Sequence, residues 1–274
     1  MSKMRALLRR LGPNIRFRLS ASNNFLYKLY YKYLYKPKPD TIGAFLDQFS
    51  RLLDGKVSVV QVGANDGVNH DPISKYIKRD GWTGVLLEPQ KNIHDDFLRK
   101  VYARDLGIKT LCAAIGPEDG KATLYKIGWC NMRWASGLAS FQRKTVEYAY
   151  SSGLVARAIE KHDLMMPDDE ALHITTEDVE VISPATLIRK FKIDSISLLQ
   201  IDTEGYDYEV IKMFDISTTQ PMAIIYENMH LSEADKASCE EYLIANQYMV
   251  KDYGANTLAL YSNIPESLVK FATS

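Results

Sequence analysis

Four short apolar runs in this chain are each followed by residues whose types suit chemistry. These residues are Gly63, Asn65 and Asp66 after the first run, Glu88 after the second, Asp202 and Glu204 after the third, and Glu227, Asn228 and His230 after the fourth. If the runs are parallel strands, their carboxyl ends lie along one edge of a sheet, where open α/β sheets bind ligands. We therefore expect a site in which several carboxylates and one histidine face a common ligand.

The first of these ends is a glycine turn with the spacing G-x-x-x-G, from Gly63 to Gly67. Glycines there let the backbone approach a ligand where a Cβ would collide. The dinucleotide pattern G-x-G-x-x-G and the phosphate-binding pattern G-x-x-x-x-G-K-[ST] are both absent. The turn instead suits a ligand with an amine, accepted by Asn65 and Asp66, and a ribose, accepted by Glu88.

Strand-like and helix-like segments alternate around these residues, which predicts an α/β fold with a mostly parallel, twisted sheet, an antiparallel closing strand and helices on both faces. The predicted strands are 57–62, 85–88, 109–115, 197–202, 223–227, 248–253 and 257–261. The predicted helices are 41–53, 72–79, 92–104, 184–191, 206–214 and 232–246.

The length of 274 residues suits one such domain with an extension. We predict a basic, aromatic-rich helical extension over residues 1–50 and the α/β domain over residues 51–274. The regular alternation weakens between about 120 and 181, apart from a possible strand at 121–127. Insertions of this kind in α/β enzymes usually build the substrate side or a lid.

The formal net charge of zero conceals an uneven distribution along the chain. Residues 1–38 carry ten basic side chains and no acidic one, and the remaining 236 residues carry 24 basic and 34 acidic side chains, a balance of −10. Such an arm can lie on an anionic membrane surface, contact nucleic acid, or pack on its own domain or on a second subunit. Packing is the plainest of these interpretations, and nucleic acid is the least favoured.

Cys112, Cys130 and Cys239 form neither a disulfide framework nor a zinc pattern, which favours a reducing compartment. No apolar run approaches the roughly 18 residues that span a bilayer. Residues 1–20 also lack the apolar region of a signal peptide. We therefore expect a cytoplasmic protein, with contact at the inner face of the membrane as an option.

Six segments together resemble the FkbM family of S-adenosylmethionine-dependent methyltransferases. They are VVQVGANDG at 59–67, LLEP at 86–89, AAIG at 113–116, GLASF at 137–141, LLQIDTEGYDYEVI at 198–211 and IIYENMH at 224–230. The resemblance implies a Rossmann-like class I methyltransferase fold. It also implies S-adenosylmethionine as cofactor and O-methylation of a hydroxyl on a sugar, glycoconjugate or related natural product.

With such a cofactor, Ala113 and Ala114 are expected to line the adenine pocket, and Asp202 to lie near the transferred methyl group. His230 is the candidate general base, with a structural hydrogen-bonding role as its alternative. Asp202 and Glu204 either contact the reactants or bond to backbone amides in their own turn.

A divalent metal is a further option at these strand ends. Asp202, Glu227 and Asn228 resemble the acid, acid and amide set that holds magnesium in catechol O-methyltransferases. Oxygen ligands of this kind suit Mg²⁺, and a metal would lower the pKa of an acceptor hydroxyl.

The acceptor side is predicted from less specific signals. His70 and Asp71 follow the glycine turn, where they either border the acceptor pocket or cap a helix. In the insertion, aromatic and arginine side chains suit a sugar, although core packing explains the aromatic ones equally well. These residues are Trp129, Arg133, Trp134 and Phe141.

Two other classes of function compete with the enzymatic one. A non-catalytic nucleotide-binding module would recruit partners through the basic arm, and a homo-oligomer is a separate possibility. An NAD oxidoreductase would use the same fold, but the missing G-x-G-x-x-G leaves the pyrophosphate without its usual seat.

Overall fold

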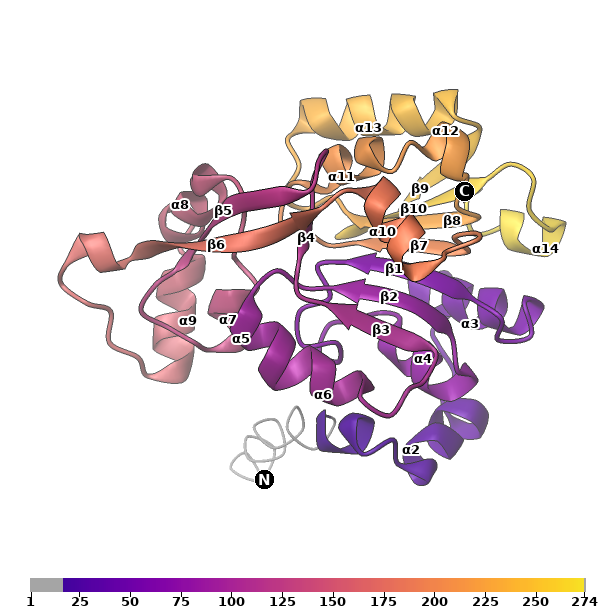
Figure 1. Cartoon of the computed structure of the whole chain (residues 1–274), viewed down its shortest axis with the longest axis horizontal. Helices are drawn as coiled ribbons and strands as arrows, with labels where there is room; N and C mark the ends of the chain where they lie inside the picture. Colours follow the sequence, from indigo (N-terminus) through magenta and orange to yellow (C-terminus); the bar gives the residue numbers. More distant parts are fainter. Residues whose placement is uncertain (1–16, 274) are drawn as a thin grey trace.

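A seven-stranded, mostly parallel sheet forms the centre of the molecule (Figure 1). The computed structural model of the protein describes residues 17–273. The strand order is β3-β2-β1-β7-β8-β10-β9, and β10 runs antiparallel to both of its neighbours. The strands are β1 (Ser58–Val62), β2 (Thr83–Leu87), β3 (Ile108–Leu111), β7 (Leu198–Ile201), β8 (Ala223–Glu227), β9 (Tyr248–Asp252) and β10 (Asn256–Tyr261). This arrangement confirms the predicted fold class.

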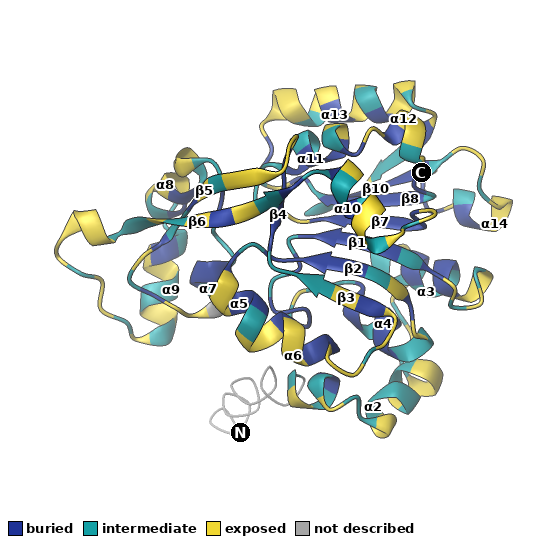
Figure 2. Ribbon diagram, in the orientation of Figure 1, coloured by how far each residue is buried: buried dark blue, intermediate teal, exposed yellow. Residues whose placement is uncertain are grey.

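Helices cover both faces of this sheet because successive strand residues point to opposite sides. Val59 belongs to one apolar cluster and Val60 to the other, and both are fully buried. The first cluster includes side chains from α3 (Ile42–Leu52), α4 (Ser74–Asp80), the π-helix η2 (His94–Leu98), α6 (Arg99–Tyr102) and α14 (Glu266–Val269). The second includes α10 (Pro184–Phe191), α11 (Asp207–Met213), α12 (Ile216–Thr219) and α13 (Glu233–Ala245). Figure 2 shows the strands buried between these layers.

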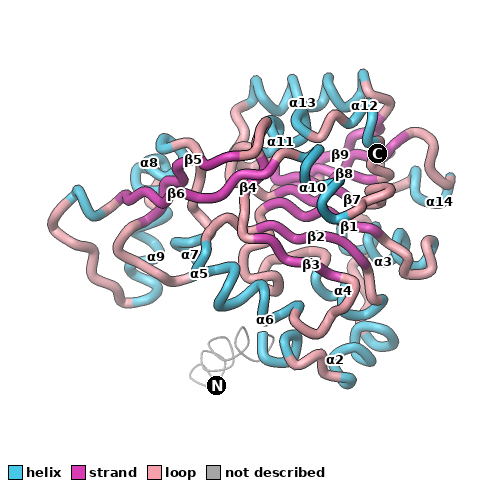
Figure 3. Tube along the Cα trace, viewed as in Figure 1, coloured by secondary structure: helices cyan, strands magenta, loops and turns pink. Residues whose placement is uncertain are grey.

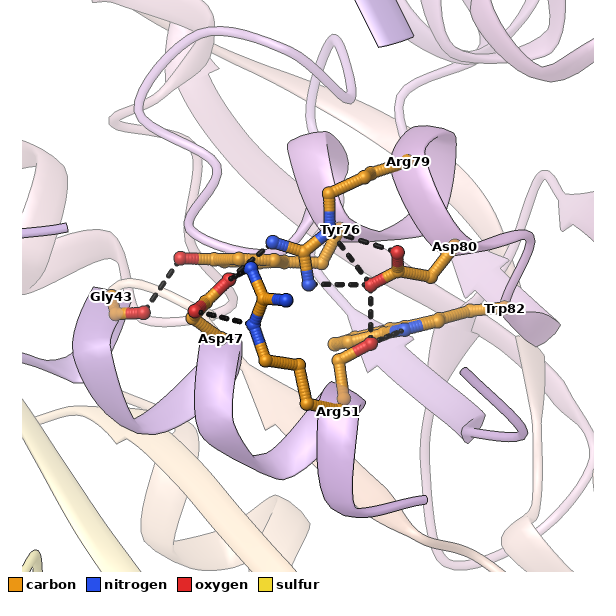
Figure 4. A network of polar contacts seen from close by, with 8 residues as sticks. Gly43, Asp47, Arg51, Tyr76, Arg79, Asp80 and Trp82 are labelled. Carbon is orange, nitrogen blue, oxygen red and sulfur yellow. Dashed lines mark hydrogen bonds and ion pairs between the residues drawn. The ribbon is translucent and has the colours of Figure 1, made fainter. Parts of the chain in front are cut away.

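Helix α3 is fixed to the domain by a polar network that Figure 4 shows from close by. Arg79 on α4 forms ion pairs with Asp47 on α3 and with Asp80, and its side chain is 2% exposed. The predicted boundary between residues 50 and 51 lies inside α3, whose apolar face is part of the domain core. Residues of the predicted extension therefore contribute to this core, and the division into domains stays a prediction.

A smaller three-stranded sheet is formed by β4 (Ala114–Ile115), β6 (Ile174–Ile182) and β5 (Gly120–Ile127). The predicted strand over 109–115 is therefore divided, since β3 ends at Leu111 in the large sheet and β4 pairs with β6. Between β5 and β6 the chain forms helices and loops, as Figure 3 shows. The helices are α7 (Arg133–Ser136), α8 (Arg143–Ser151), α9 (Leu154–His162) and η3 (Glu170–Leu172). Figure 1 places this unit beyond the carboxyl ends of the parallel strands.

The predicted helix over 92–104 is made of three consecutive pieces, α5 (Lys91–Ile93), η2 and α6. N-terminal to α3, residues 17–21 are helical, followed by α2 (Phe25–Leu29) and the π-helix η1 (Tyr30–Leu34). The rest of the predicted helical arm, residues 1–16, lies outside the described residues. In the described part of the chain no helix has the length and apolar character needed to cross a bilayer.

Candidate active site

A cavity of about 1280 Å³ lies where the carboxyl ends of β1, β2, β7 and β8 meet the smaller sheet and its helices. Six carboxyl groups line it, as do three histidines and one lysine among the described side chains. The acidic residues are Asp66, Asp71, Glu88, Asp202, Glu204 and Glu227, and the basic ones are His70, Lys161, His162 and His230. The structure thus brings together the strand ends that the sequence singles out.

Gly63 is required by a close approach between β1 and β7. Its φ is +80°, and an added Cβ would lie 1.8 Å from the carbonyl oxygen of Asp202. Gly67 has a different role from the predicted one, because it does not line the cavity. With φ of +69°, its missing Cβ leaves room for Leu98 and Tyr102, whose nearest atoms would lie 2.7 and 2.8 Å away. Gly67 therefore serves helix packing.

The side chains of Asn65 and Asp66 line the cavity but are used mainly to shape their own turn. Asp66 Oδ1 accepts hydrogen bonds from the backbone N–H groups of Val68 and Asn69, both at 2.9 Å. Asn69 Nδ2 donates to Asp66 Oδ2 at 2.7 Å. Asn65 Oδ1 accepts from the N–H of Asp66 at 2.8 Å. These bonds hold the turn that presents the cavity wall.

Glu88, just beyond β2, is a buried carboxyl group of the cavity, with 3% exposure. It accepts from the N–H of Asn65 at 3.0 Å and from the N–H and Nε2 of Gln90 at 2.9 and 3.3 Å. Burial raises the pKa of Glu88 to about 7, although these three donors favour the charged form. Glu88 thus links the glycine turn to the second strand end and still faces the cavity.

Of the two alanines predicted for an adenine pocket, the structure brings only Ala114 to the cavity. Ala113 is 4% exposed and belongs to the second apolar cluster, which includes Val60. The chain leaves the large sheet after Leu111, so the two alanines do not continue a third parallel strand. This break is why only one of them lines the cavity.

Gln61 on β1 and Gln200 on β7 are site residues that the sequence interpretation missed. They are direct partners in the strand register, both are nearly fully buried, and both line the cavity. The Oε1 atom of each has no hydrogen-bond partner. Each glutamine interrupts a run of apolar strand residues, a signal that was available in the sequence. Together they supply buried acceptor atoms at the cavity wall.

The acidic end of the cavity is organised around His230. Its Nε2 lies 3.0 Å from Glu204 Oε2 and 3.9 Å from Glu227 Oε2. The contact with Glu204 raises the pKa of His230 above its ordinary value. For Glu227, burial and then the charge of Asp202 raise the pKa to about 9. Enclosure by the cavity walls and then the charge of Glu204 raise the pKa of Asp202 well above its usual range. Such groups are suited to holding and moving protons.

Asp207, at the start of α11, is the residue that holds these strand ends in place. It is fully buried and accepts from the N–H groups of Thr203 and Gly205, at 3.3 Å each, and of Glu227 at 3.2 Å. Burial raises its pKa to about 6. The predicted bonding of turn amides to Asp202 and Glu204 is therefore made by Asp207 instead.

The metal set predicted from the sequence is not brought together. Asn228 is 7% exposed, does not line the cavity, and its Nδ2 donates to Asp252 Oδ1 at 3.1 Å and Thr257 Oγ1 at 2.9 Å. The physical reason is that neighbouring residues at a strand end point in opposite directions. Single ligand atoms of Glu204, Glu227 and His230 lie within 4.8 Å of one another, but this mixed set differs from the oxygen set predicted for Mg²⁺.

Four of the predicted acceptor residues lie at the cavity, and they are His70, Asp71, Trp134 and Phe141. Asp71 Oδ1 also accepts from the N–H groups of Ile73 and Ser74, at 2.8 and 3.1 Å, so it caps the start of α4. Trp129 does not line the cavity, because its Nε1 donates to Tyr150 Oη at 2.9 Å inside the cluster of the insertion. Arg133 begins α7, and its side chain lies outside the described part of the structure.

A search of curated proteins found no significant match. Solved structures similar to the chain include a delta-N METTL16 MTase domain, with 10% identity, a TM-score of 0.38, and coverage of 90% of this chain and 98% of that one. Another is a human methyltransferase 10 domain containing protein, with 9% identity, a TM-score of 0.37, and coverage of 83% and 85%.

The comparison with family models identifies the family of the chain. The model of the methyltransferase FkbM domain matches residues 61–255. This range begins at Gln61 on β1 and includes all four strand ends that form the cavity. The chain therefore belongs to the FkbM family of methyltransferases.

Proposed function

We propose that this methyltransferase transfers a methyl group from S-adenosylmethionine to a hydroxyl group of a sugar, glycoconjugate or related natural product. The observation that carries the proposal is the His230–Glu204 pair, which lies in the same cavity as the acids of the parallel strand ends. The pair offers a base to an acceptor hydroxyl. The strand ends offer polar groups that suit a cationic nucleoside.

The chemistry of the cavity fits this cofactor. S-adenosylmethionine carries a sulfonium and an ammonium group, and a wall with six carboxyl groups favours such positive charge. The buried Oε1 atoms of Gln61 and Gln200 without partners supply acceptors for an ammonium group. Glu88, at the end of the second strand, is suited to ribose hydroxyls. When bound, the cofactor supplies an activated methyl group, and the protein's part is to align the acceptor with it.

His230 is suited to take the proton of an acceptor hydroxyl. Its side chain is 16% exposed, and the contact with Glu204 orients the imidazole and stabilises its protonated form. General base catalysis of this kind contributes roughly 10²- to 10⁴-fold to a rate. Because that contact raises the pKa of His230, the free base forms only at a pH higher than for an ordinary histidine.

Aromatic side chains in the cavity wall favour a sugar-like acceptor. Trp134, Phe141 and Tyr206 all line the cavity. The rings of Phe141 and Tyr206 pack against each other with their centroids 5.9 Å apart. Flat apolar faces next to carboxylates and histidines match a sugar ring, which has apolar C–H faces and a polar rim.

The competing functions are less well supported by the same cavity. A nicotinamide dinucleotide would place its anionic pyrophosphate in a cavity whose described side chains include six carboxyl groups and a single lysine. A purely recruiting module has no use for a raised His230 pKa inside a cavity.

The direct test incubates the full chain with labelled S-adenosylmethionine and a panel of sugars, sugar nucleotides and glycan fragments, with amine analogues as the comparison. The proposal expects label in at least one hydroxyl acceptor and loss of that activity in His230→Ala. Transfer to amine acceptors alone would contradict the O-methyltransferase assignment. Transfer that is unchanged in His230→Ala would remove the base from the proposal.

A further inference from the structure

The segment that precedes the methyltransferase fold carries an exposed apolar stripe. We call Phe25, Leu26, Tyr30, Tyr33 and Leu34 the apolar stripe; their exposures are 70, 72, 48, 66 and 73%. They lie on α2 and η1, at the periphery of the molecule (Figure 2). Exposed apolar groups gathered in this way mark a surface that meets a partner or a membrane.

The spacing of the stripe follows from its helices. Leu26, Tyr30 and Leu34 recur every four residues, which places them on one side of the α2 and η1 turns. The segment is held by other residues, since Arg104 Nη1 donates to the carbonyl of Ser22 at 3.1 Å and Lys75 Nζ lies 5.5 Å from the ring centre of Tyr35. The segment therefore packs on the domain and still leaves the stripe open.

The charges around the stripe are all of one sign. The described residues 17–38 contain no acidic side chain and five basic ones. The basic residues are Arg18, Lys28, Lys32, Lys36 and Lys38. Residues 39–274 carry a balance of −10. An anionic surface would attract this segment and repel much of the remaining molecule, which fixes how the molecule lies on it.

We propose that the apolar stripe and its lysines form a docking surface for an anionic lipid membrane. A helix with Phe and Leu on one side, lysines beside them and no acids matches the pattern of helices that lie in the membrane interface. Tyrosine rings such as Tyr30 and Tyr33 prefer the headgroup level of a bilayer. A nucleic acid would use the lysines but leave Phe25, Leu26 and Leu34 in water.

The position of the segment connects this surface to the active site. Phe17 lines the catalytic cavity, and its ring packs edge-on against Phe97 with the centroids 5.6 Å apart. The N-terminal segment that carries the stripe thus also contributes a side chain to the cavity wall. The docking surface does not depend on which acceptor is methylated.

Sedimentation of the full chain with vesicles tests this proposal. The vesicles are pure phosphatidylcholine or phosphatidylcholine mixed with phosphatidylglycerol. One variant removes apolar residues (Phe25→Ser, Leu26→Ser and Leu34→Ser), and a second reverses charge (Lys32→Glu, Lys36→Glu and Lys38→Glu). The matched control, Leu106→Ser with Met165→Ser, changes apolar residues that are 91 and 92% exposed elsewhere. All the substituted side chains are exposed, so the fold is expected to remain, as circular dichroism would show.

The expected result is binding to the anionic vesicles that weakens with salt, falls roughly tenfold or more in both variants, and is retained in the control. Equal binding by the variants and the unchanged chain would overturn the proposal, as would no binding or no preference for phosphatidylglycerol. Sedimentation without vesicles tests whether a second copy of the chain covers the apolar stripe instead. A dimer that only the apolar variant dissociates would assign the stripe to self-association and also overturn the proposal.

Discussion

The imidazole of His230 and the carboxylate of Glu204 approach to 3.0 Å although both residues come from loops, one after β8 and one after β7. Glu204 reaches this position with φ of +54°, next to Gly205. A carboxylate at this distance stabilises the imidazolium form, which is why the pKa of His230 lies above 6.5. The pair therefore couples the protonation of the candidate base to a residue on a neighbouring strand end.

This coupling predicts the pH dependence of methyl transfer. Because the base must be neutral to accept a proton, kcat/KM should rise with pH through a value above that of an ordinary histidine. In Glu204→Gln the stabilising charge is lost, so the rising limb should move to lower pH. The measurement is kcat/KM against pH for both proteins, and a limb that stays at the same pH in the variant would contradict the role of Glu204.

The raised pKa of Glu227 predicts that the fold loses stability as the pH increases. Its pKa is about 9 in the folded chain and near 4.5 when unfolded, so between these values the folded chain holds a proton that the unfolded chain releases. The free energy of unfolding should therefore fall as pH rises through this window. Glu227→Gln imitates the protonated side chain and should make the slope shallower by up to about 1.4 kcal/mol per pH unit. Urea unfolding between pH 5 and pH 9 measures this, and parallel slopes would show that Glu227 is ionised in the fold.

The close contact at Gly63 predicts that a methyl group added there lowers the stability of the fold far more than one added at an open glycine. In Gly63→Ala the new Cβ meets the Asp202 carbonyl at 1.8 Å, so the two strand ends must separate. We expect a loss of about 3 kcal/mol or more in unfolding free energy. Gly254→Ala is the matched control, since its φ is +91° but no atom lies within 4 Å of the added Cβ. A similar loss in both variants would assign the effect to backbone conformation alone.

The polar network around Arg79 predicts a second contrast in stability. The Arg79 side chain is 2% exposed and paired with Asp47 and Asp80, so Arg79→Ala takes the buried cation from both carboxylates and leaves Asp47 with Arg51 alone. Breaking a buried pair of this kind costs about 3–5 kcal/mol. Arg51 also pairs with Asp47 but is 59% exposed, so Arg51→Ala should cost about 1 kcal/mol or less. Chemical unfolding of both variants checks this, and equal losses would contradict the burial argument.

Local patterns in the sequence were sufficient for the sheet and for much of the cavity wall. Buried strands read as apolar runs, and Glu88, Asp202 and Glu227 end such runs because the ligand edge of the sheet is polar. The pairing of β5 with β6 was not predictable in this way, because it joins residues about fifty positions apart. Local periodicity does not report such distant pairing.

Specific physical reasons also explain why some predicted site residues do not lie at the cavity. Asn228 follows Glu227 directly, and the alternation of side chains turns it toward Asp252 and Thr257. Gly67 looks like a ligand-binding glycine, but the space beside it is filled by Tyr102. Gln61 and Gln200 stand out in the sequence as polar residues inside apolar strands, but only the register across the sheet shows that they are neighbours.

The central claim is that a methyl-donor nucleoside binds at the carboxyl edge of the parallel sheet. Calorimetry with S-adenosylhomocysteine measures this most directly, with NAD as the comparison ligand and Glu88→Ala as the variant. We predict binding of the full chain with a Kd on the order of micromolar, about 8 kcal/mol in free energy, and weaker binding in Glu88→Ala. Binding of NAD together with no heat from S-adenosylhomocysteine would contradict the account.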